Sequence, residues 1–419
     1  MIKIKRLSLI ANLQPFLICL IASGALGGGY ALPYQSAKAL GLGNAVTAGV
    51  NDPSAVYSNP AALSEVEGNQ ILGGEQYINV VSSVKNSGRN SRNQHDDNFI
   101  PTLFANYHIP STDVTLGLGL YTPFGLATTY KPSSFTRFGA VRSELKLFYI
   151  TPALAWRPVR SLAIGGGFSL VHSSALFSRA LFLGAGSEGK IRLTGKDNGY
   201  AYNLGMLFKP DEQWTFGLTY RGRVDLRYDT ADVKVVNATG ALETGRSKGT
   251  LIPLPPVISM GINWQINPDW DVEFVYDYTH WSEFKHLRAN FTPTFLGGTL
   301  SGLFIEERWK DTHTFRFGSS YRLDPNWTAR AGMVLDESPI PASTLGPSIP
   351  GADSLTFNAG LGYQWNNWKV DLGYAAIFYK KRSVNNNVLE ANSASTLTPG
   401  RDQYSTFDNF VSVTVGYKF

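Results

Sequence analysis

The last nine residues of the chain alternate strictly between apolar side chains and small or polar ones, and the chain ends on an aromatic residue. Because successive side chains of a β-strand point to opposite faces, this segment would have one wholly apolar face. That face carries Val411, Val413, Val415, Tyr417 and Phe419. Such a strand fits a transmembrane β-barrel with lipid on its outside, provided that the pattern recurs along the chain with the same polarity.

The same alternation recurs along the chain after residue 70. We predict an all-β fold with fourteen strands, an even number, as is usual for bacterial outer-membrane barrels. No apolar run after residue 31 approaches the length of a membrane-spanning helix. The predicted strands are 70–84, 98–109, 114–121, 145–156, 162–177, 199–208, 214–228, 256–265, 270–281, 312–323, 327–336, 354–365, 369–379 and 407–419.

The connections between these strands alternate in length, as they do in an outer-membrane barrel with short periplasmic turns and long extracellular loops. Pro, Asn and Asp supply tight-turn geometry in the six short connections. Tryptophan side chains prefer the membrane interface, and seven of the nine flank short connections. The other two, Trp281 and Trp309, bracket one long loop. The long connections are 85–97, 122–144, 178–198, 229–255, 282–311, 337–353 and 380–406.

Clean alternation also assigns the two faces of several strands. In 312–323, Phe315 and Phe317 would meet lipid while Arg316 faces the lumen. The opposite assignment would place a guanidinium in hydrocarbon, at a cost of about 2–4 kcal/mol at the bilayer midplane. The other charged residues assigned to the lumen are Arg330, Glu273 and Asp277. The lumen is therefore expected to be polar and to carry charges of both signs.

Residues 1–31 are predicted to be a secretory signal peptide. Three basic residues precede the apolar run 16–22, and residues 29–31 form a small-x-small cleavage site. The run is too short to span a membrane at roughly 20 residues per helix. The only cysteine, Cys19, lies in this segment, so the mature chain would contain no disulfide and no metal thiolate.

The remaining composition excludes several classes of function. Removal of the three basic residues lowers the formal net charge from +5 to 5 − 3 = +2, so nucleic-acid binding is not indicated. The six histidines show no metal-ligand spacing, and neither a metal nor a cofactor is expected. Ser173 and His172 are adjacent on one strand, so they point to opposite faces and cannot form a catalytic pair there.

Residues 32–69 precede the barrel region 70–419 and do not alternate. Small residues are frequent in this segment and would allow close packing in a confined space. We predict a hatch, or plug, in the barrel lumen. A disordered periplasmic tail is the alternative, and the apolar content of the segment favours packing over solvation.

Several short passages, in order along the whole mature chain, resemble the FadL/TodX family of outer-membrane transporters for long-chain fatty acids and other hydrophobic compounds. Each is weak alone, and the specificity lies in their combination. They are 37–45 (AKALGLGNA), 57–63 (YSNPAAL), 122–128 (TPFGLAT), 254–259 (LPPVIS), 281–284 (WSEF), 326–332 (NWTARAG) and 336–339 (DESP).

The resemblance implies a fourteen-stranded barrel closed by an N-terminal hatch, whose Asn-Pro-Ala motif corresponds here to Asn59, Pro60 and Ala61. It also implies an inward kink in the third strand, which opens the barrel wall so that a hydrophobic ligand leaves sideways into the outer membrane. Pro removes a ladder hydrogen bond and Gly tolerates a bend. The candidate kink residues are Pro123, Phe124 and Gly125, and an ordinary extracellular turn is the alternative.

Apolar side chains in the long loops are the expected capture surface for such a ligand. The alternative is that they only pack the loops against one another. The candidates are Leu181, Phe182, Leu183, Val235 and Val236. A fatty-acid carboxylate would need a cation to offset its desolvation, and Arg179, Arg316 and Arg330 are candidates, although each could instead pair with an acid in the lumen.

The expected partners are a long-chain fatty acid or another hydrophobic ligand, outer-membrane lipid and lipopolysaccharide, and the barrel assembly machinery, which would bind the strand ending in Phe419. The expected location is the outer membrane of a Gram-negative bacterium. Uptake of aromatic hydrocarbons, which need no carboxylate partner, stays open as an alternative. A general porin and an outer-membrane lipase are less favoured, because a porin would leave its aqueous path unobstructed.

Overall fold

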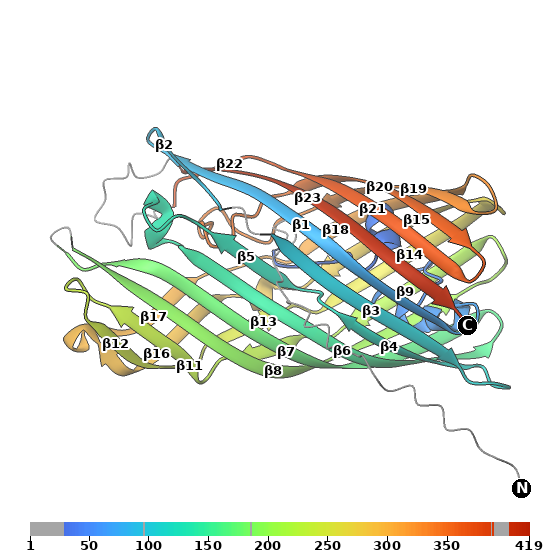
Figure 1. The fold of residues 1–419 in the computed structure, drawn as a ribbon, viewed down its shortest axis with the longest axis horizontal. Coiled ribbons are helices and arrows are strands. Elements are labelled where there is room, and N and C mark those ends of the chain that lie inside the picture. Colours follow the sequence, from blue (N-terminus) through green and yellow to red (C-terminus); the bar gives the residue numbers. More distant parts are fainter. Residues whose placement is uncertain (1–28, 95–96, 185–186, 387, 389–401) are drawn as a thin grey trace, which may run out of the picture.

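The computed structural model describes residues 29–94, 97–184, 187–386, 388 and 402–419, and the predicted signal peptide lies outside them except for residues 29–31. The described chain forms a closed antiparallel barrel of fourteen strands, as predicted (Figure 1). The last strand pairs with the first along residues 403–418 and 70–85, which closes the wall. The wall strands are β1 (Gln70–Asn86), β3 (Asn98–His108), β4 (Val114–Tyr121) continued by β5 (Gly125–Thr129), β6 (Arg142–Val159), β7 (Leu162–Phe182), β8 (Glu188–Phe208), β9 (Trp214–Arg221), β14 (Val257–Asn267), β15 (Trp270–Thr279), β18 (Thr312–Arg322), β19 (Trp327–Asp336), β20 (Ser354–Trp365), β21 (Trp368–Tyr379) and β23 (Asp402–Lys418).

The predicted faces are confirmed by side-chain exposure. On β18, Phe315 and Phe317 are 43% and 46% exposed, whereas Arg316 between them is only 7% exposed. On β23, Val413 and Val415 are exposed, and the polar residues that alternate with them are buried. The alternation therefore separates a lipid-facing outside from a polar inside. No helix in the described part of the chain is long and apolar enough to cross a membrane.

Six tryptophans next to the short turns are exposed, in agreement with an interfacial belt. They are Trp156, Trp264, Trp270, Trp327, Trp365 and Trp368. The prediction was wrong for Trp281 and Trp309, which are 1% and 3% exposed and lie in the interior. Their indoles pack on the N-terminal segment of the same chain, a tertiary contact that the position at a strand end does not reveal.

The predicted long loops 178–198, 229–255 and 282–311 contribute strands to one continuous sheet. β7 and β8 continue beyond their predicted ends and pair to their tips, Phe182 and Glu188. β8 then pairs with β11 (Ala231–Val236), β11 with β12 (Leu242–Lys248), β12 with β16 (His286–Phe295) and β16 with β17 (Leu300–Glu306). The sheet extends the barrel at its long-loop end and encloses a second apolar core. Shorter elements of the loops are β2 (Arg89–Arg92), η2 (Phe135–Phe138), β10 (Val224–Arg227), β13 (Leu251–Leu254), η3 (Trp281–Glu283), η4 (Leu296–Gly298) and β22 (Arg382–Val384).

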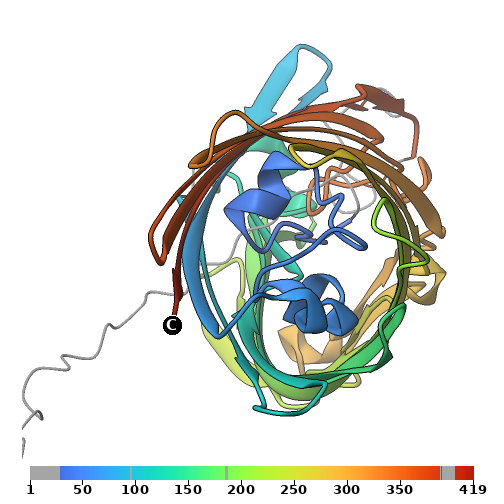
Figure 2. The same cartoon turned by 90° about the vertical axis from the view of Figure 1, so that its right-hand side faces the viewer.

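Residues 29–69 lie inside the ring of strands (Figure 2). This lumen segment contains α1 (Ala37–Gly41), α2 (Ala55–Ser58) and η1 (Pro60–Glu65). Ser36 caps α1 by accepting a hydrogen bond from the Ala39 amide, at 3.2 Å. The backbone of the lumen segment lies directly against glycines of the inner wall, because a Cβ on these wall residues would clash with it. The glycines that it touches are Gly165, Gly205, Gly217, Gly318, Gly332, Gly360 and Gly373.

Candidate functional site

The third wall strand is interrupted where the kink was predicted. The ladder between β3 and β4 ends at the pair Leu103 and Leu120. Beyond it, β5 pairs with β6 alone, and residues 98–102 of β3 pair only with β1. The interruption is not a turn between two wall strands, since β4 and β5 both pair with β6. The wall therefore has no ladder of backbone hydrogen bonds between β3 and β5.

The start of the lumen segment is paired with this break. The Leu32 amide donates to the Pro123 carbonyl at 2.8 Å, and the Gly125 amide donates to the Tyr30 carbonyl at 2.9 Å. The Gln35 side chain adds a donor to the Thr122 carbonyl at 2.9 Å. The backbone groups that leave the wall ladder are thus satisfied by the lumen segment, which couples the two features physically.

An aromatic cluster holds the first described residues of the chain. Tyr30 is 1% exposed and packs against Phe124, Trp281, Phe284 and Trp309, with ring centroids 4.8–6.1 Å apart. Its hydroxyl donates to the Pro253 carbonyl at 2.5 Å. Gly29 has a φ of +69°, and a Cβ there would lie 2.6 Å from the Trp309 ring. A larger residue at position 29 would therefore displace this cluster.

The Asn-Pro-Ala motif fastens the lumen segment to the wall at β7 and β8. The fully buried Asn59 side chain donates to the Thr47 carbonyl at 2.8 Å and to the Met206 carbonyl of β8 at 3.2 Å. Its oxygen accepts the Ala61 amide at 3.1 Å, which caps η1, and Pro60 occupies the first position of that helix. One side chain therefore joins two parts of the segment to the barrel.

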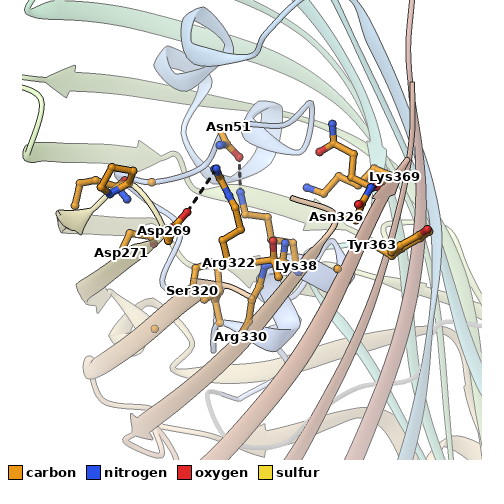
Figure 3. Close-up of a pocket in the computed structure, with 18 of the residues that line it drawn as sticks. Lys38, Asn51, Asp269, Asp271, Ser320, Arg322, Asn326, Arg330, Tyr363 and Lys369 are labelled. Atoms are coloured by element: carbon orange, nitrogen blue, oxygen red, sulfur yellow. Dashed lines mark hydrogen bonds and ion pairs between the residues drawn. The ribbon is translucent and has the colours of Figure 1, made fainter. Parts of the chain in front are cut away.

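A polar cavity of about 610 Å³ lies at the short-turn end of the lumen, between the lumen segment and the wall (Figure 3). Lys38 donates to Asn51 at 2.5 Å and lies 3.8 Å from the Asp52 carboxylate. Burial lowers the pKa of Lys38 to about 8, and the attraction of Asp52 opposes this effect. The remaining charges of the cavity include Asp269, Asp271, Glu273, Arg322, Arg330 and Lys369. Such a lining is suited to water and poorly suited to a hydrocarbon chain.

A second large cavity, of about 310 Å³, lies among the long loops. Arg179 of β7, Phe304 and Ile305 of β17, and residues of the loop 337–353 line it. It adjoins a smaller, mainly apolar cavity that shares Arg179 and Ile305. The further apolar residues of that smaller cavity are Phe177, Ile191, Leu193, Leu287, Ala289 and Leu303. We call the two together the outer cavity.

The outer cavity reaches the aromatic cluster through Glu307. This carboxylate lines the cavity and accepts a hydrogen bond from the Trp309 indole at 2.8 Å. Burial raises the pKa of Glu307 to about 7. Trp309 in turn packs on Tyr30, 5.5 Å between ring centroids. Contacts therefore run from the outer cavity to the residues that pair with the wall break.

The three arginines proposed from the sequence lie in different surroundings. Arg316 forms an ion pair with Asp277 at 2.7 Å, and Arg330 forms one with Asp371 at 2.8 Å. These are ion pairs of the kind that the sequence left open. Arg179 has no ion pair with a described residue, and its Nε atom is buried without a hydrogen-bond partner there.

The capture residues proposed from the sequence also differ in how far they are buried. Val235 is fully buried in the second apolar core, with Leu181 packed against it. Val236 and Leu183 are half-buried, and Phe182 is 37% exposed. Val235 and Leu181 therefore belong to the second apolar core, and none of the five residues lines the outer cavity.

Sequence reasoning missed Tyr30, Glu307 and Arg221. Tyr30 was assigned to a cleavage site, and Glu307 lies in a loop without a motif. Arg221 follows the alternation of β9 and could have been assigned to the lumen face on that basis, although nothing local indicates its contacts with the lumen segment. Among the described residues, no group of three or more His, Cys, Asp or Glu could hold a metal ion.

Comparison with known proteins decides the family. The sequence model of the family described as outer membrane protein transport protein (OMPP1/FadL/TodX) matches residues 18–419. The chain belongs to this family. It is an outer-membrane protein, and the resemblance stated from its motifs is confirmed over the whole barrel.

Relatives within the OMPP1/FadL/TodX family cover nearly the full chain. The long-chain fatty acid transport protein of Escherichia coli K12 is 25% identical over 415 residues, which are 88% of this chain and 92% of that protein. Outer membrane protein P1 of Haemophilus influenzae Rd is 24% identical and covers 86% of this chain and 88% of its own length.

Solved structures agree with the fold. A Pseudomonas aeruginosa FadL homologue superimposes with a TM-score of 0.81 at 18% identity and covers 94% of this chain and 100% of its own. The toluene transporter TodX of Pseudomonas putida superimposes with a TM-score of 0.74 at 20% identity, covering 94% and 99%. The architecture is therefore shared at low sequence identity.

Proposed function

We propose that this OMPP1/FadL/TodX family member takes up long-chain fatty acids or similar hydrophobic molecules passively and releases them sideways through the wall break between β3 and β5. The observation that carries the proposal is the backbone pairing of the lumen segment with that break, at Tyr30 and Leu32. Relatives named as long-chain fatty acid transport proteins support the ligand class. Transport rather than catalysis follows at the level of the family.

The path begins in the outer cavity and ends at the wall. A ligand captured among the loops meets Glu307, Trp309 and Tyr30 before it reaches Phe124 at the break. Onward passage towards the short turns would lead into the charged cavity around Lys38, where an alkyl chain loses its apolar environment. The apolar route out of the barrel is therefore lateral, through the wall break.

Growth and uptake assays test this function. Cells that lack their own carriers and express this protein should take up oleate, and those with the empty vector should not. Uptake of toluene in the same cells tests the aromatic-hydrocarbon alternative, which the fold shared with TodX keeps open. Transport of neither compound would remove the proposal.

The outer cavity is suited to a carboxylate because of Arg179. The Nε atom of Arg179 is buried without a partner among the described residues, and Phe177 and Leu303 line the same cavity, so a head group there would gain a charge-assisted hydrogen bond. Replacement by methionine should weaken oleate binding by about ten- to a hundredfold and leave toluene binding unchanged. Equilibrium binding to purified protein in detergent measures both.

Arg308→Met is the matched control, since Arg308 is an exposed extracellular arginine paired with Glu306. It should bind oleate like the unmodified protein. Equal binding by the Arg179 and Arg308 variants would contradict a role for Arg179.

The structure also bears on processing. Cleavage after Ala31 would remove Tyr30 from its aromatic cluster and delete the acceptor of the Gly125 amide. We therefore propose that the signal peptidase cuts before Gly29 rather than after Ala31. Mass spectrometry of protein extracted from outer membranes should find an N-terminal peptide that contains Tyr30, and a peptide beginning at Leu32 would contradict this.

Two further partners are proposed on similar grounds. Phe419 is 73% exposed at the end of β23, the strand that pairs with β1 to close the wall, where the barrel assembly machinery would bind it. The loop sheet that surrounds the outer cavity would contact lipopolysaccharide.

A further inference from the structure

The outward face of the loop sheet is basic where β8, β11 and β12 lie side by side at the long-loop end of the barrel (Figure 1). Every second residue there faces inwards, and Ile191 and Val233 in this way reach the second apolar core. The residues between them are exposed, and six of these carry a positive charge. We call the six the basic face: Lys190, Arg192 and Lys196 of β8, Lys234 of β11, and Arg246 and Lys248 of β12.

The basic face lacks matching acids among the described residues. Two acids, Glu188 and Asp232, lie on the outward side of the same strands, and Glu188 is already engaged by Arg137. None of the six basic side chains forms an ion pair with a described residue. At the same end of β23 the outward residues Gln403 and Ser405 are neutral, so the excess of positive charge is not common to every strand.

Two of these positive charges oppose each other directly. Arg192 of β8 and Lys234 of β11 are register partners in the antiparallel ladder, and both are exposed. Like charges in this position destabilise a sheet, because the Cβ atoms of such partners are only about 4.5–5.5 Å apart. An anion shared by the two side chains would remove the repulsion and accept charge-assisted hydrogen bonds from both.

The basic face begins close to the edge of the membrane. On β8 the outward residues from Phe208 to Tyr200 are apolar or aromatic, and all are exposed. At about 3.3 Å per residue and a tilt of about 40°, they span about 20 Å of an apolar band about 25 Å tall. Lys196 follows on the same face towards the loops, at the depth where the phosphate groups of lipopolysaccharide lie.

We propose that the basic face binds phosphate groups of lipopolysaccharide, with one phosphate shared by Arg192 and Lys234. This defines a site for the lipopolysaccharide contact given above, and it rests on the outer-membrane location rather than on the uptake function. Ile191 and Leu193, which alternate with the basic residues of β8, line the outer cavity. The bound lipid therefore stabilises one wall of that cavity from the outside, as a structural partner of the loop sheet.

A fluorescent deep-rough lipopolysaccharide tests the site by titration into the purified protein in neutral detergent. A double variant, Arg192→Gln with Lys234→Gln, should bind it about thirtyfold more weakly, since each basic residue near an anionic lipid surface contributes about fivefold. The same probe without its phosphates should bind the unmodified protein about as weakly. Inorganic phosphate should not compete, because the site recognises phosphate carried by a lipid in the membrane.

Lys131→Gln with Lys310→Gln is the matched control. Both lysines are exposed in other long loops and lie outside the basic face, so the control removes the same amount of charge. It should bind the probe like the unmodified protein.

Hydrogen exchange follows the loop sheet itself. Addition of deep-rough lipopolysaccharide should slow the exchange of backbone amides in β11 and β12 of the unmodified protein, because the shared anion holds the strands together. In the variant with Arg192→Gln and Lys234→Gln, the exchange should no longer depend on the lipid.

Several results would overturn the site. These are equal binding by the double variant and the unmodified protein, undiminished binding after removal of the phosphates, an equal loss in the control variant, and competition by inorganic phosphate. Oleate binding separates the site from the uptake function, since the double variant should bind oleate like the unmodified protein. Failure of the unmodified protein to take up oleate would contradict the transport proposal and leave the lipopolysaccharide site standing.

Discussion

Replacement of Gly165 by valine should open an ion-conducting path through the barrel lumen. A Cβ at Gly165 would lie 2.5 Å from the Ala61 amide nitrogen and the Pro60 carbonyl carbon. These are backbone atoms that cannot rotate away, so the Asn-Pro-Ala motif must leave its seat on β7 and β8. Single-channel recordings in planar bilayers should then show a large, steady conductance that the unmodified protein lacks.

Gly166→Val provides the matched control on the same strand. Gly166 points to the outer face, where the nearest atom to an added Cβ is a Leu204 side-chain carbon at 3.3 Å. This variant should keep the low conductance, since it adds apolar volume only towards lipid. If Gly165→Val remained closed in a folded barrel, the lumen segment would not act as the hatch that the sequence predicts.

Introduction of an arginine at Gly125 should abolish uptake. Gly125 is buried at the first position of β5, and its amide donates to the Tyr30 carbonyl at the wall break. A long charged side chain there would fill the exit and place a cation on the hydrophobic route. Uptake of oleate and toluene should both fall to the level of cells without the protein, because the exit serves ligands with and without a head group.

Gln213→Arg is the control for the added charge, since Gln213 lies at an exposed short turn between β8 and β9. Gly125→Trp fills the same space without a charge and should also block uptake, which keeps the test informative if the arginine variant does not fold. Uptake at the normal rate by a folded Gly125 variant would show that ligands leave by another route.

The wall strands could be predicted well because the surroundings of each strand determine a pattern in its own sequence. β4, β19 and β20 have the predicted bounds, and Arg316 and Phe317 lie on the predicted faces. Lipid on one side and a polar lumen on the other impose a period of two that is visible within a single strand.

The loops were less predictable for a related reason. β11 and β16 lie beyond the barrel proper, and the apolar residues that share a core there, such as Val235 and Phe291, come from distant parts of the sequence. Their partners, and hence their strands, are defined only by the tertiary fold.

The candidate site depends still more on contacts over long sequence separations. The residues of the wall break could be suggested from Pro123 and Gly125, since both have local conformational preferences. The binding of Tyr30 between Phe124 and Trp309 could not, because it joins the beginning of the chain to two remote segments. Whether Arg179 and Arg221 find a partner likewise depends on their neighbours in the fold, which the strand pattern does not identify.

The contrast between the two surfaces of the wall has a consequence for how such proteins diverge. Outward positions such as Phe317 and Val413 only have to be apolar, so many side chains serve equally well there. Inward positions such as Gly165 and Gly332 leave no room for even one extra methyl group. Substitutions should therefore accumulate on the membrane side, and two barrels of this kind can share a shape at a sequence identity of only 18%.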